Sequence, residues 1–333
     1  MLKNKYLLLV VLIAGTIFFG CKKNVSDDKD KTLNDRTNVV QNDTAVTINL
    51  DNPVANEEIL LRFQPEIGKT YNIENTSSYT INEAQDSLKM TLKSNKYAKV
   101  SLRILSRENN SYKMEFLLTD AGETIKTDTS TIVYKYGKAL TDPQADMGRK
   151  VEDCLVNSPL TIIMNTAGEG TDVQGYDAII KKVRAVIGQD IPDQYIAAQI
   201  GTPTDNLENY FITYPDTTIK IGETWNYTAG SQLQGVPIML KNSYTLADRR
   251  DGIAYINFNT VIEIDKSQIP AELLSQMANI KFTAYIKGTG EVEEKTGWPI
   301  LMKIAQGISL TDSYDGHVTT SKQVSNSTIK WAR

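Results

Sequence analysis

Two cysteines are the residues whose types most directly indicate chemistry in this chain. Cys21 follows Gly20 at the end of an apolar run, residues 6–19, which Lys3 and Lys5 precede. That run has about 14 residues, fewer than the ~20 that a membrane-spanning helix needs. It is therefore typical of a signal peptide that is cut before Cys21. The chemistry that follows such a cut is acylation of the cysteine thiol.

The residues before the expected cut support this interpretation. Phe18-Phe19-Gly20-Cys21 resembles a bacterial lipobox, with Phe18 where leucine is usual. We expect residues 1–20 to be removed and Cys21 to carry a lipid anchor, in which each buried methylene contributes about 0.8 kcal/mol. The alternative is an ordinary secretory signal in which Cys21 is incidental. No later segment approaches a spanning length, so we expect the rest of the chain to lie in water.

The second thiol is a weak candidate for catalysis. With Cys21 acylated, Cys154 is the only free thiol, which excludes an intramolecular disulfide and a cysteine-based zinc site. We interpret Cys154 as a small buried apolar residue. A nucleophile would normally have a histidine nearby, and the single histidine, His317, lies among polar residues near the C-terminus. No Gly-x-Ser-x-Gly motif is present.

The acidic residues give no clear active site either. Glu291, Glu293 and Glu294 follow one another on an expected strand, as in a solvated polar row. Asp312 and Asp315 are more typical of a turn than of a calcium loop, because alternating oxygen ligands are missing. A glycosidase-like pair elsewhere among the 40 acidic residues stays open. We therefore predict no catalytic residue, no cofactor and no metal ligand.

The tryptophans are candidates for ligand contact. Trp225 and Trp298 lie at the starts of expected strands, and Trp331 lies near the C-terminus. Aromatic residues at such positions usually pack in the core or across strands. Contact of Trp225 or Trp298 with a sugar or an apolar ligand is the alternative.

Composition limits the partners. The chain has 36 basic and 40 acidic residues, a formal net charge of −4, and no clustered basic face, so a nucleic-acid partner is not expected. Hydrophobic residues make up 41% of the chain, enough for a large core.

Residues 21–58 are polar and charged, which is typical of a disordered tether between anchor and domain. The acidic cluster in residues 26–30 resembles the signal that exports Bacteroidota-type lipoproteins to the cell surface; a merely solvated linker is the alternative. Asp43-Thr44-Ala45 resembles a short O-glycosylation acceptor, as do residues 86–88 and 216–218, and Thr44 in the tether is the best candidate.

From about residue 60 the apolar residues alternate with polar ones, which predicts β-strands. Residues 100–104 and 112–116 form one expected hairpin around a turn at 108–110, and residues 131–136 form another strand. A second hairpin is expected at 244–246 and 254–258, around Asp251-Gly252.

Two short stretches indicate an internal repeat. Ile67-Gly68-Lys69-Thr70-Tyr71-Asn72 matches Ile221-Gly222-Glu223-Thr224-Trp225-Asn226, and the hairpins that follow also match, with offsets of 154 and then 142 residues. In each copy the glycine precedes a strand, where a turn with positive φ is its expected role. We predict two copies of one β unit.

Between the copies the spacing is helical. Residues 175–187 predict a helix with Ile179, Val183 and Ile187 on its apolar face, and two shorter helices are expected over 192–201 and from 204 or 205 to 212. Ile196 would lie on the second helix, with its apolar face also directed to cargo or core. After them come strands around 282–286, 291–294 and 300–304, with turns at 295–297 and at Asp315-Gly316.

The predicted fold is mainly β, with a minor helical part: a large curved antiparallel sheet or half-barrel built from two similar β units. We expect a signal peptide at 1–20, a tether at 21–58 and a β-rich domain at 59–333. That domain divides into a first repeat at 59–175, a helical insert at 176–212 and a second repeat at 213–333.

These features together resemble a family of Bacteroidota-type outer-membrane lipoproteins that is known only as a domain of unknown function. Its recurring elements are matched by residues 60–63 and 67–71, by 168–175 before a helix, by Tyr214-Pro215 before 219–225, and by 288–290 with 295–297. The resemblance implies a secreted, lipid-anchored β domain and supplies no catalytic residues.

Three functions stay open. The first is a non-catalytic envelope lipoprotein at the outer membrane whose β domain binds or scaffolds an unknown protein, glycan or lipid. The second is a carrier or receptor for a lipid or other apolar ligand, because a curved sheet with helices across it resembles envelope proteins that shuttle lipoproteins. The helices at 176–212 would then be a lid, with Ile179, Val183, Ile187 and Ile196 facing the cargo or the core. The third is a hydrolase acting on glycans or peptides.

Overall fold

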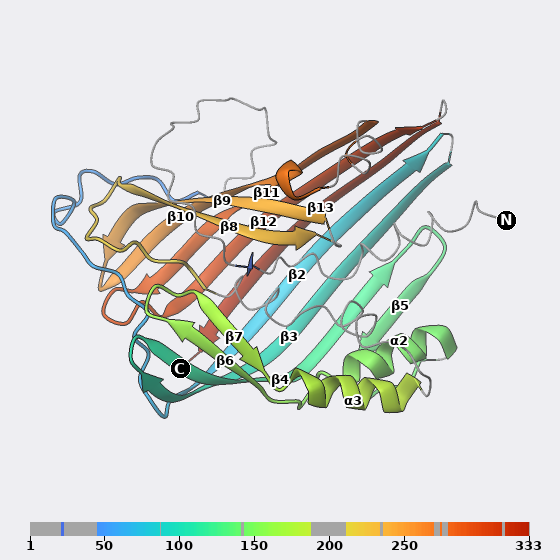
Figure 1. Ribbon diagram of the computed structural model, residues 1–333, viewed down its shortest axis with the longest axis horizontal. Coiled ribbons are helices and arrows are strands. Elements are labelled where there is room, and N and C mark those ends of the chain that lie inside the picture. Colours follow the sequence, from blue (N-terminus) through green and yellow to red (C-terminus); the bar gives the residue numbers. More distant parts are fainter. Residues whose placement is uncertain are drawn as a thin grey trace.

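The computed structural model of the chain describes residues 21–22, 45–86, 88–140, 143–187, 211–233, 236–269, 274, 279–314 and 317–332. The predicted fold class is confirmed. In this part of the chain, thirteen strands form one large open antiparallel sheet (Figure 1). Two short helices, α2 (Pro143–Asp153) and α3 (Tyr176–Ile187), lie near one edge of the sheet.

In the described part of the chain, the first half of the sheet has three long strands followed by three short ones. They are β2 (Thr70–Gln85), β3 (Leu88–Glu108), β4 (Ser111–Lys126), β5 (Thr131–Lys135), β6 (Leu160–Asn165) and β7 (Gly170–Gln174). The predicted first hairpin is β3 and β4, joined at Asn109, whose φ is +54°. The predicted strand at 131–136 is β5.

The second half repeats this pattern. Its strands are β8 (Thr224–Leu233), β9 (Val236–Arg250), β10 (Ile253–Ile264), β11 (Ile280–Glu293), β12 (Pro299–Tyr314) and β13 (His317–Ala332). A short 3-10 helix at Lys266–Gln268 follows β10. The predicted second hairpin is β9 and β10.

The two halves form one continuous sheet rather than two. The order is β1-β8-β9-β10-β11-β12-β13-β2-β3-β4-β6-β7, with β5 also paired to β4. β13 and β2 join the halves over their full length, from Thr319 opposite Gln85 to Ala332 opposite Asn72. The two-residue strand β1 (Cys21–Lys22) pairs with β8 at the other edge.

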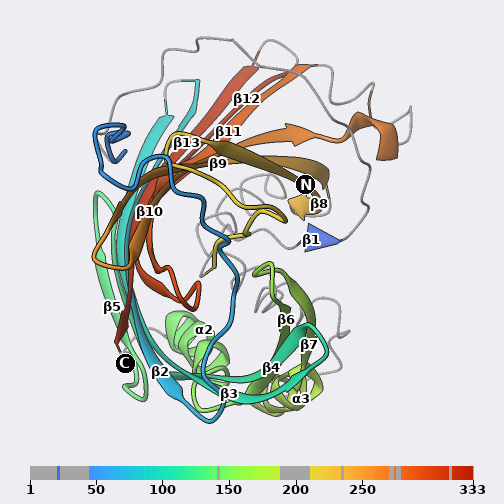
Figure 2. The same ribbon diagram turned by 90° about the vertical axis from the view of Figure 1, so that its left-hand side faces the viewer.

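The sheet is strongly curved, and α2 lies on its concave side (Figure 2). Open sheets of more than about ten strands rarely stay flat, because the twist of each strand accumulates. Alternation along β2 separates the faces: Tyr71 and Ile73 are buried on the concave face, while Asn72 and Glu74 between them are exposed.

Part of the segment that sequence analysis places in the tether lies against the sheet. Val46 donates its N–H to Oδ1 of Asn257 at 2.8 Å, and the Asn257 side-chain amide donates back to the Val46 carbonyl at 2.7 Å. Asn52 bonds Asp248 and the Arg249 carbonyl. Residues 45–58 are thus held by side chains of β9 and β10, pairings about 200 residues apart that a polar composition does not reveal.

The helical insert agrees with prediction where it can be compared. The helix expected over 175–187 is α3. The two shorter helices, with Ile196, fall largely outside the described residues, as do Thr44 and Asp315. α2, β6 and β7 were not expected from the sequence.

Candidate functional site

The concave face of the sheet carries two hydrophobic clusters: one at an end that we call the closed end, where described segments form a second layer, and one at an end that we call the open end, where all described members of the cluster come from the strands. At the closed end, segments 59–63 and 211–221 form a second layer over the sheet and enclose the main hydrophobic core. Aromatic rings fill its centre: Trp298 stacks on Tyr71 with ring centroids 3.7 Å apart, and Phe63 lies 5.6 Å from Trp298.

Both candidate ligand-contact tryptophans belong to this core. Trp298 is 2% exposed and Trp225 is 9% exposed. Trp225 stacks on Tyr244 and donates its indole N–H to the Thr213 carbonyl at 2.8 Å. Trp225 also lines a polar cavity of about 430 Å³ with Tyr214 and Thr217. The ring contacts of Trp298 are with the core residues Phe63, Tyr71 and Phe211.

An apolar patch occupies the open end of the second half. We define the apolar patch as Ile238, Leu240, Ile262, Ala284 and Ile308, all at most 9% exposed. The register of β9 to β12 aligns them on the concave face, with Leu240 opposite Ile262, Ile262 opposite Ala284, and Ala284 opposite Ile308.

The patch differs from the main core in one respect. Its members among the described residues, with the partly buried Phe282 and Ile286, all come from one face of four adjacent strands. A sheet face normally buries its apolar residues against a second layer. A polar pair separates the patch from the core, because the Thr260 hydroxyl donates to Oδ1 of Asn242 at 2.6 Å across β9 and β10.

On the first half the concave face carries a charged cluster instead. Glu123 is 8% exposed, and its Oε1 atom accepts hydrogen bonds from the hydroxyls of Tyr79 and Ser94, each at 2.6 Å. Lys96 Nζ lies 3.2 Å from Glu123 Oε2. Burial raises the pKa of Tyr79 well above its ordinary value, and the negative charge of Glu123 raises it further. Glu123 thus has a partner at both of its oxygens, Tyr79 and Ser94 at one and Lys96 at the other.

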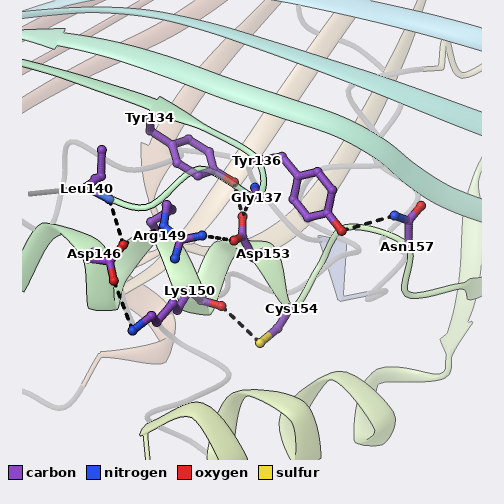
Figure 3. Close-up of polar contacts among 10 residues, drawn as sticks. All are labelled: Tyr134, Tyr136, Gly137, Leu140, Asp146, Arg149, Lys150, Asp153, Cys154 and Asn157. Carbon is purple, nitrogen blue, oxygen red and sulfur yellow. Dashed lines mark hydrogen bonds and ion pairs between the residues drawn. The ribbon is translucent and has the colours of Figure 1, made fainter.

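α2 covers the end of this half through a polar network (Figure 3). Arg149 pairs with Asp146 and Asp153, and the Tyr134 hydroxyl donates to Asp153 Oδ1 at 3.1 Å. The hydrogen bond from Arg149 holds the pKa of Asp146 well below its ordinary value, with help from the Leu140 N–H. α2 has few apolar residues, so these contacts position it.

Cys154 lies just after α2, where it lines a cavity of about 580 Å³ with Lys150, Lys182 and neighbouring residues. Its thiol is 8% exposed and lies 3.2 Å from the Lys150 carbonyl, to which it donates (Figure 3). Burial raises its pKa, whereas a reactive cysteine has a lowered pKa.

The predicted lid residues on α3 face a small core. Ile179 and Val183 are at most 1% exposed and pack with Cys154 and Leu160, and Ile187 packs partly buried beside them. The helix therefore presents its apolar side to Leu160 of β6 and to Cys154, just after α2.

The acidic candidates are engaged in structural contacts. Glu294 accepts a forked pair of bonds from Arg249, at 2.9 and 3.1 Å, and Glu293 accepts from the Thr296 hydroxyl at 2.5 Å. Asp312 lies within β12, and His317 begins β13 opposite Tyr314. Within the described ranges no group of three or more potential metal-ligating side chains comes together. None of the helices described there is long and apolar enough to cross a membrane.

A family model covers much of this architecture. Residues 109–299 match a family of unknown function, DUF6263. The chain belongs to the DUF6263 family. The matched range runs from the turn of the first hairpin to the start of β12 at Pro299, so it contains both helices and most of the apolar patch of this DUF6263 member.

Solved structures resemble the DUF6263 chain only loosely. A structure described as lipid–protein interactions in lipovitellin aligns with a TM-score of 0.43 and 12% identity, over 78% of this chain and 25% of that chain. The DUF6263 chain thus spans about a quarter of the lipovitellin chain. An outer membrane channel from Pseudomonas putida F1 aligns with a TM-score of 0.24 and 8% identity, over 82% of this chain and 98% of the channel's chain. No curated protein matches the sequence.

Proposed function

We propose that this DUF6263 protein is a lipid-anchored envelope receptor that binds an apolar ligand on the concave face of its sheet. The observation that carries the proposal is the apolar patch, whose described members all lie on a single sheet face. An acyl chain lying on this face would pack against the patch, and burying each methylene there contributes about 0.8 kcal/mol.

The proposed action is binding rather than catalysis. Cys154 has a raised pKa, Glu123 is fully paired, and Glu293 and Glu294 are engaged at the closed end. These groups have structural partners where a nucleophile or a general acid would need access to a substrate.

The proposed location depends on Cys21. A diacylglyceryl group on its thiol would hold the domain at the outer membrane, with residues before position 45 as a tether. Metabolic labelling with an alkyne palmitate should mark the wild-type protein and leave Cys21→Ser unmarked. Equal labelling, or equal fractionation of the two with membranes, would remove the anchor from the proposal without affecting ligand binding.

Ligand binding is tested with protein that lacks residues 1–21. Native mass spectrometry and lipid extraction should find co-purified lipid, and a fluorescent fatty-acyl probe should bind. Ile262→Asn should weaken probe binding on the order of tenfold or more, because it places an amide against the chain.

Val261→Asn is the matched control. Val261 precedes Ile262 on β10, points to the opposite face and is 43% exposed, whereas Ile262 is 4% exposed. The control should bind the probe as the wild type does. Absence of lipid and probe binding, or equal loss in both variants, would reject the receptor and favour a scaffold.

A further inference from the structure

Two glutamines beside the apolar patch have buried polar atoms for which the described residues supply no partner. Gln306 on β12 and Gln323 on β13 share the concave face with the patch. The Nε2 atom of Gln306 and the Oε1 atom of Gln323 are buried, and neither has a hydrogen-bond partner in the part of the chain that the structure describes. Gln323 as a whole is 7% exposed.

The register places these two groups together at the border of the patch. Gln323 lies opposite Ile308, a patch residue, and Gln306 lies two residues before Ile308 on the same strand face. Gln306 lies opposite Ser325, so the two glutamines are diagonal neighbours across β12 and β13. Diagonal neighbours on one face are within reach of long side chains.

A molecule that pairs with both glutamines needs one hydrogen-bond acceptor and one hydrogen-bond donor. Buried polar groups in native proteins are nearly always hydrogen-bonded, because an unpaired one loses its bonds to water without compensation. Here one free group is a donor, Gln306 Nε2, and the other is an acceptor, Gln323 Oε1. A molecule that satisfies both must offer an acceptor and a donor close together.

Charge around the pair favours a neutral molecule. The residues paired with Gln306 are Ile286 and Ser325, and those paired with Gln323 are Ile81 and Ile308. None of these four is charged. The Lys96 ammonium, on the same concave face, is already paired with Glu123. A carboxylate would find no unpaired cation among these described neighbours and could not donate to Gln323.

We propose that the ligand is an uncharged amphiphile whose acyl chain lies on the apolar patch and whose head group carries both a donor and an acceptor, held between Gln306 and Gln323. This inference rests on the proposed receptor function and specifies its ligand class. A glyceryl ester with free hydroxyls and an N-acyl amide share this chemistry.

Competition with matched lipids tests the inference. Protein lacking residues 1–21 and loaded with a fluorescent fatty-acyl probe is titrated with four palmitoyl compounds: monopalmitoylglycerol, N-palmitoylethanolamine, palmitate and methyl palmitate. The first two should displace the probe on the order of tenfold more tightly than methyl palmitate, because only they satisfy both glutamines. Palmitate at pH 8 should bind no better than methyl palmitate. Comparing the affinities of the first two compounds shows whether the site prefers a glyceryl ester or an N-acyl amide.

Variants of the glutamines give a second readout. Gln306→Leu and Gln323→Leu should each remove the preference for the neutral polar heads while methyl palmitate still binds. In lipid-free protein each should raise the melting temperature, because it removes an unpaired buried polar group. Asn326→Leu, at an exposed position on the other face of β13, is the control and should retain the preference.

The outcomes are distinguishable. Equal displacement by all four compounds overturns the head-group inference and leaves the receptor in place. Displacement by none overturns both. A preference that survives Gln323→Leu, or a lower melting temperature of that variant without lipid, shows that the glutamine has a structural partner and rejects the inference.

Discussion

Gly222 donates its backbone N–H to the carbonyl of Leu246 at 2.7 Å, just before β8 begins. The same bond recurs in the other half of the sheet, where Gly68 donates to the Ile104 carbonyl at 2.8 Å before β2. Both glycines have positive φ, +89° and +83°. The repeat seen in six residues of sequence is therefore a repeat of backbone geometry.

Further equivalences extend this relationship along the hairpins. The register of β3 with β4 skips Leu105, and that of β9 with β10 skips Ala247, so a bulge occurs at the same point of each copy. The turns that follow contain Asn109 and Asp251, both with a φ of +54°. Leu105 and Ala247, and likewise Asn109 and Asp251, are separated by the same offset as the matching hairpins. The two units therefore share one plan and are joined edge to edge at β13 and β2.

The glycine turns should be required in both copies. Gly68→Ala and Gly222→Ala should each lower the free energy of unfolding by about 1–2 kcal/mol, the cost of a left-handed backbone for a residue with a Cβ. Gly148→Ala is the control, because Gly148 is helical with open space at its Cβ position, and it should raise stability by up to about 1 kcal/mol. Urea unfolding measures all three. A neutral effect at Gly68 or Gly222 would show that the turn relaxes.

The sequence was sufficient for α3 and for the strands of the two hairpins, β3 with β4 and β9 with β10, because alternating and helical periods of apolar residues are local signals; it did not reveal the short strands β6 and β7. It was not sufficient for α2, which has a polar sequence with Gly148 inside it and is positioned by Arg149, Asp153 and Tyr134. Nor could it place residues 45–58, because Val46 is bound by Asn257, far along the chain.

The candidate site was the least predictable part. Its patch residues are ordinary strand residues one by one, and only the register of β9 to β12 gathers them. Gln323 becomes informative only because β13 pairs with β2, which brings Ile81 beside it. The tryptophans, for which sequence analysis favoured packing over ligand contact, and the apolar face of α3, for which it left cargo or core open, lie in core clusters.

Replacing each candidate tryptophan by phenylalanine, which removes the indole N–H, should lower the free energy of unfolding by different amounts. Trp225→Phe leaves the partly buried Thr213 carbonyl without its donor, whereas the Trp298 N–H has no partner among the described residues. We expect Trp225→Phe to cost about 1 kcal/mol more than Trp298→Phe. Trp298→Ala should cost about 3–5 kcal/mol, since the ring stacked on Tyr71 is lost. Equal costs for the two phenylalanine variants in chemical unfolding would contradict the assigned hydrogen bond.

The charged cluster should be a strong structural contributor. Glu123→Leu leaves the buried hydroxyls of Tyr79 and Ser94 without an acceptor, and hydrogen bonds to a charged group are worth about 1.5–3 kcal/mol each. We expect a loss of at least about 3 kcal/mol, partly recovered by adding Tyr79→Phe. In Glu123→Gln the pKa of Tyr79 should fall, because the neighbouring negative charge is removed, although burial keeps it raised. Absorbance titration at alkaline pH would refute this if the Tyr79 transition did not move.

Glu83 should make the free energy of unfolding fall as the pH rises, as a buried carboxyl group does. It lies on the concave face opposite Ser321, and burial raises its pKa above the ordinary 4.5. The folded state therefore binds its proton more tightly than the unfolded state does, so its contribution to stability is greatest below the unfolded pKa and is lost as pH rises through the folded value. Glu83→Gln removes this loss and should gain stability relative to the wild type between pH 4 and pH 7. Glu74→Gln is the matched control, since the Glu74 side chain lies on the opposite face of β2 and is 62% exposed. Unfolding free energies measured across that range should separate the two variants, and parallel curves would mean that Glu83 is solvated on the concave face.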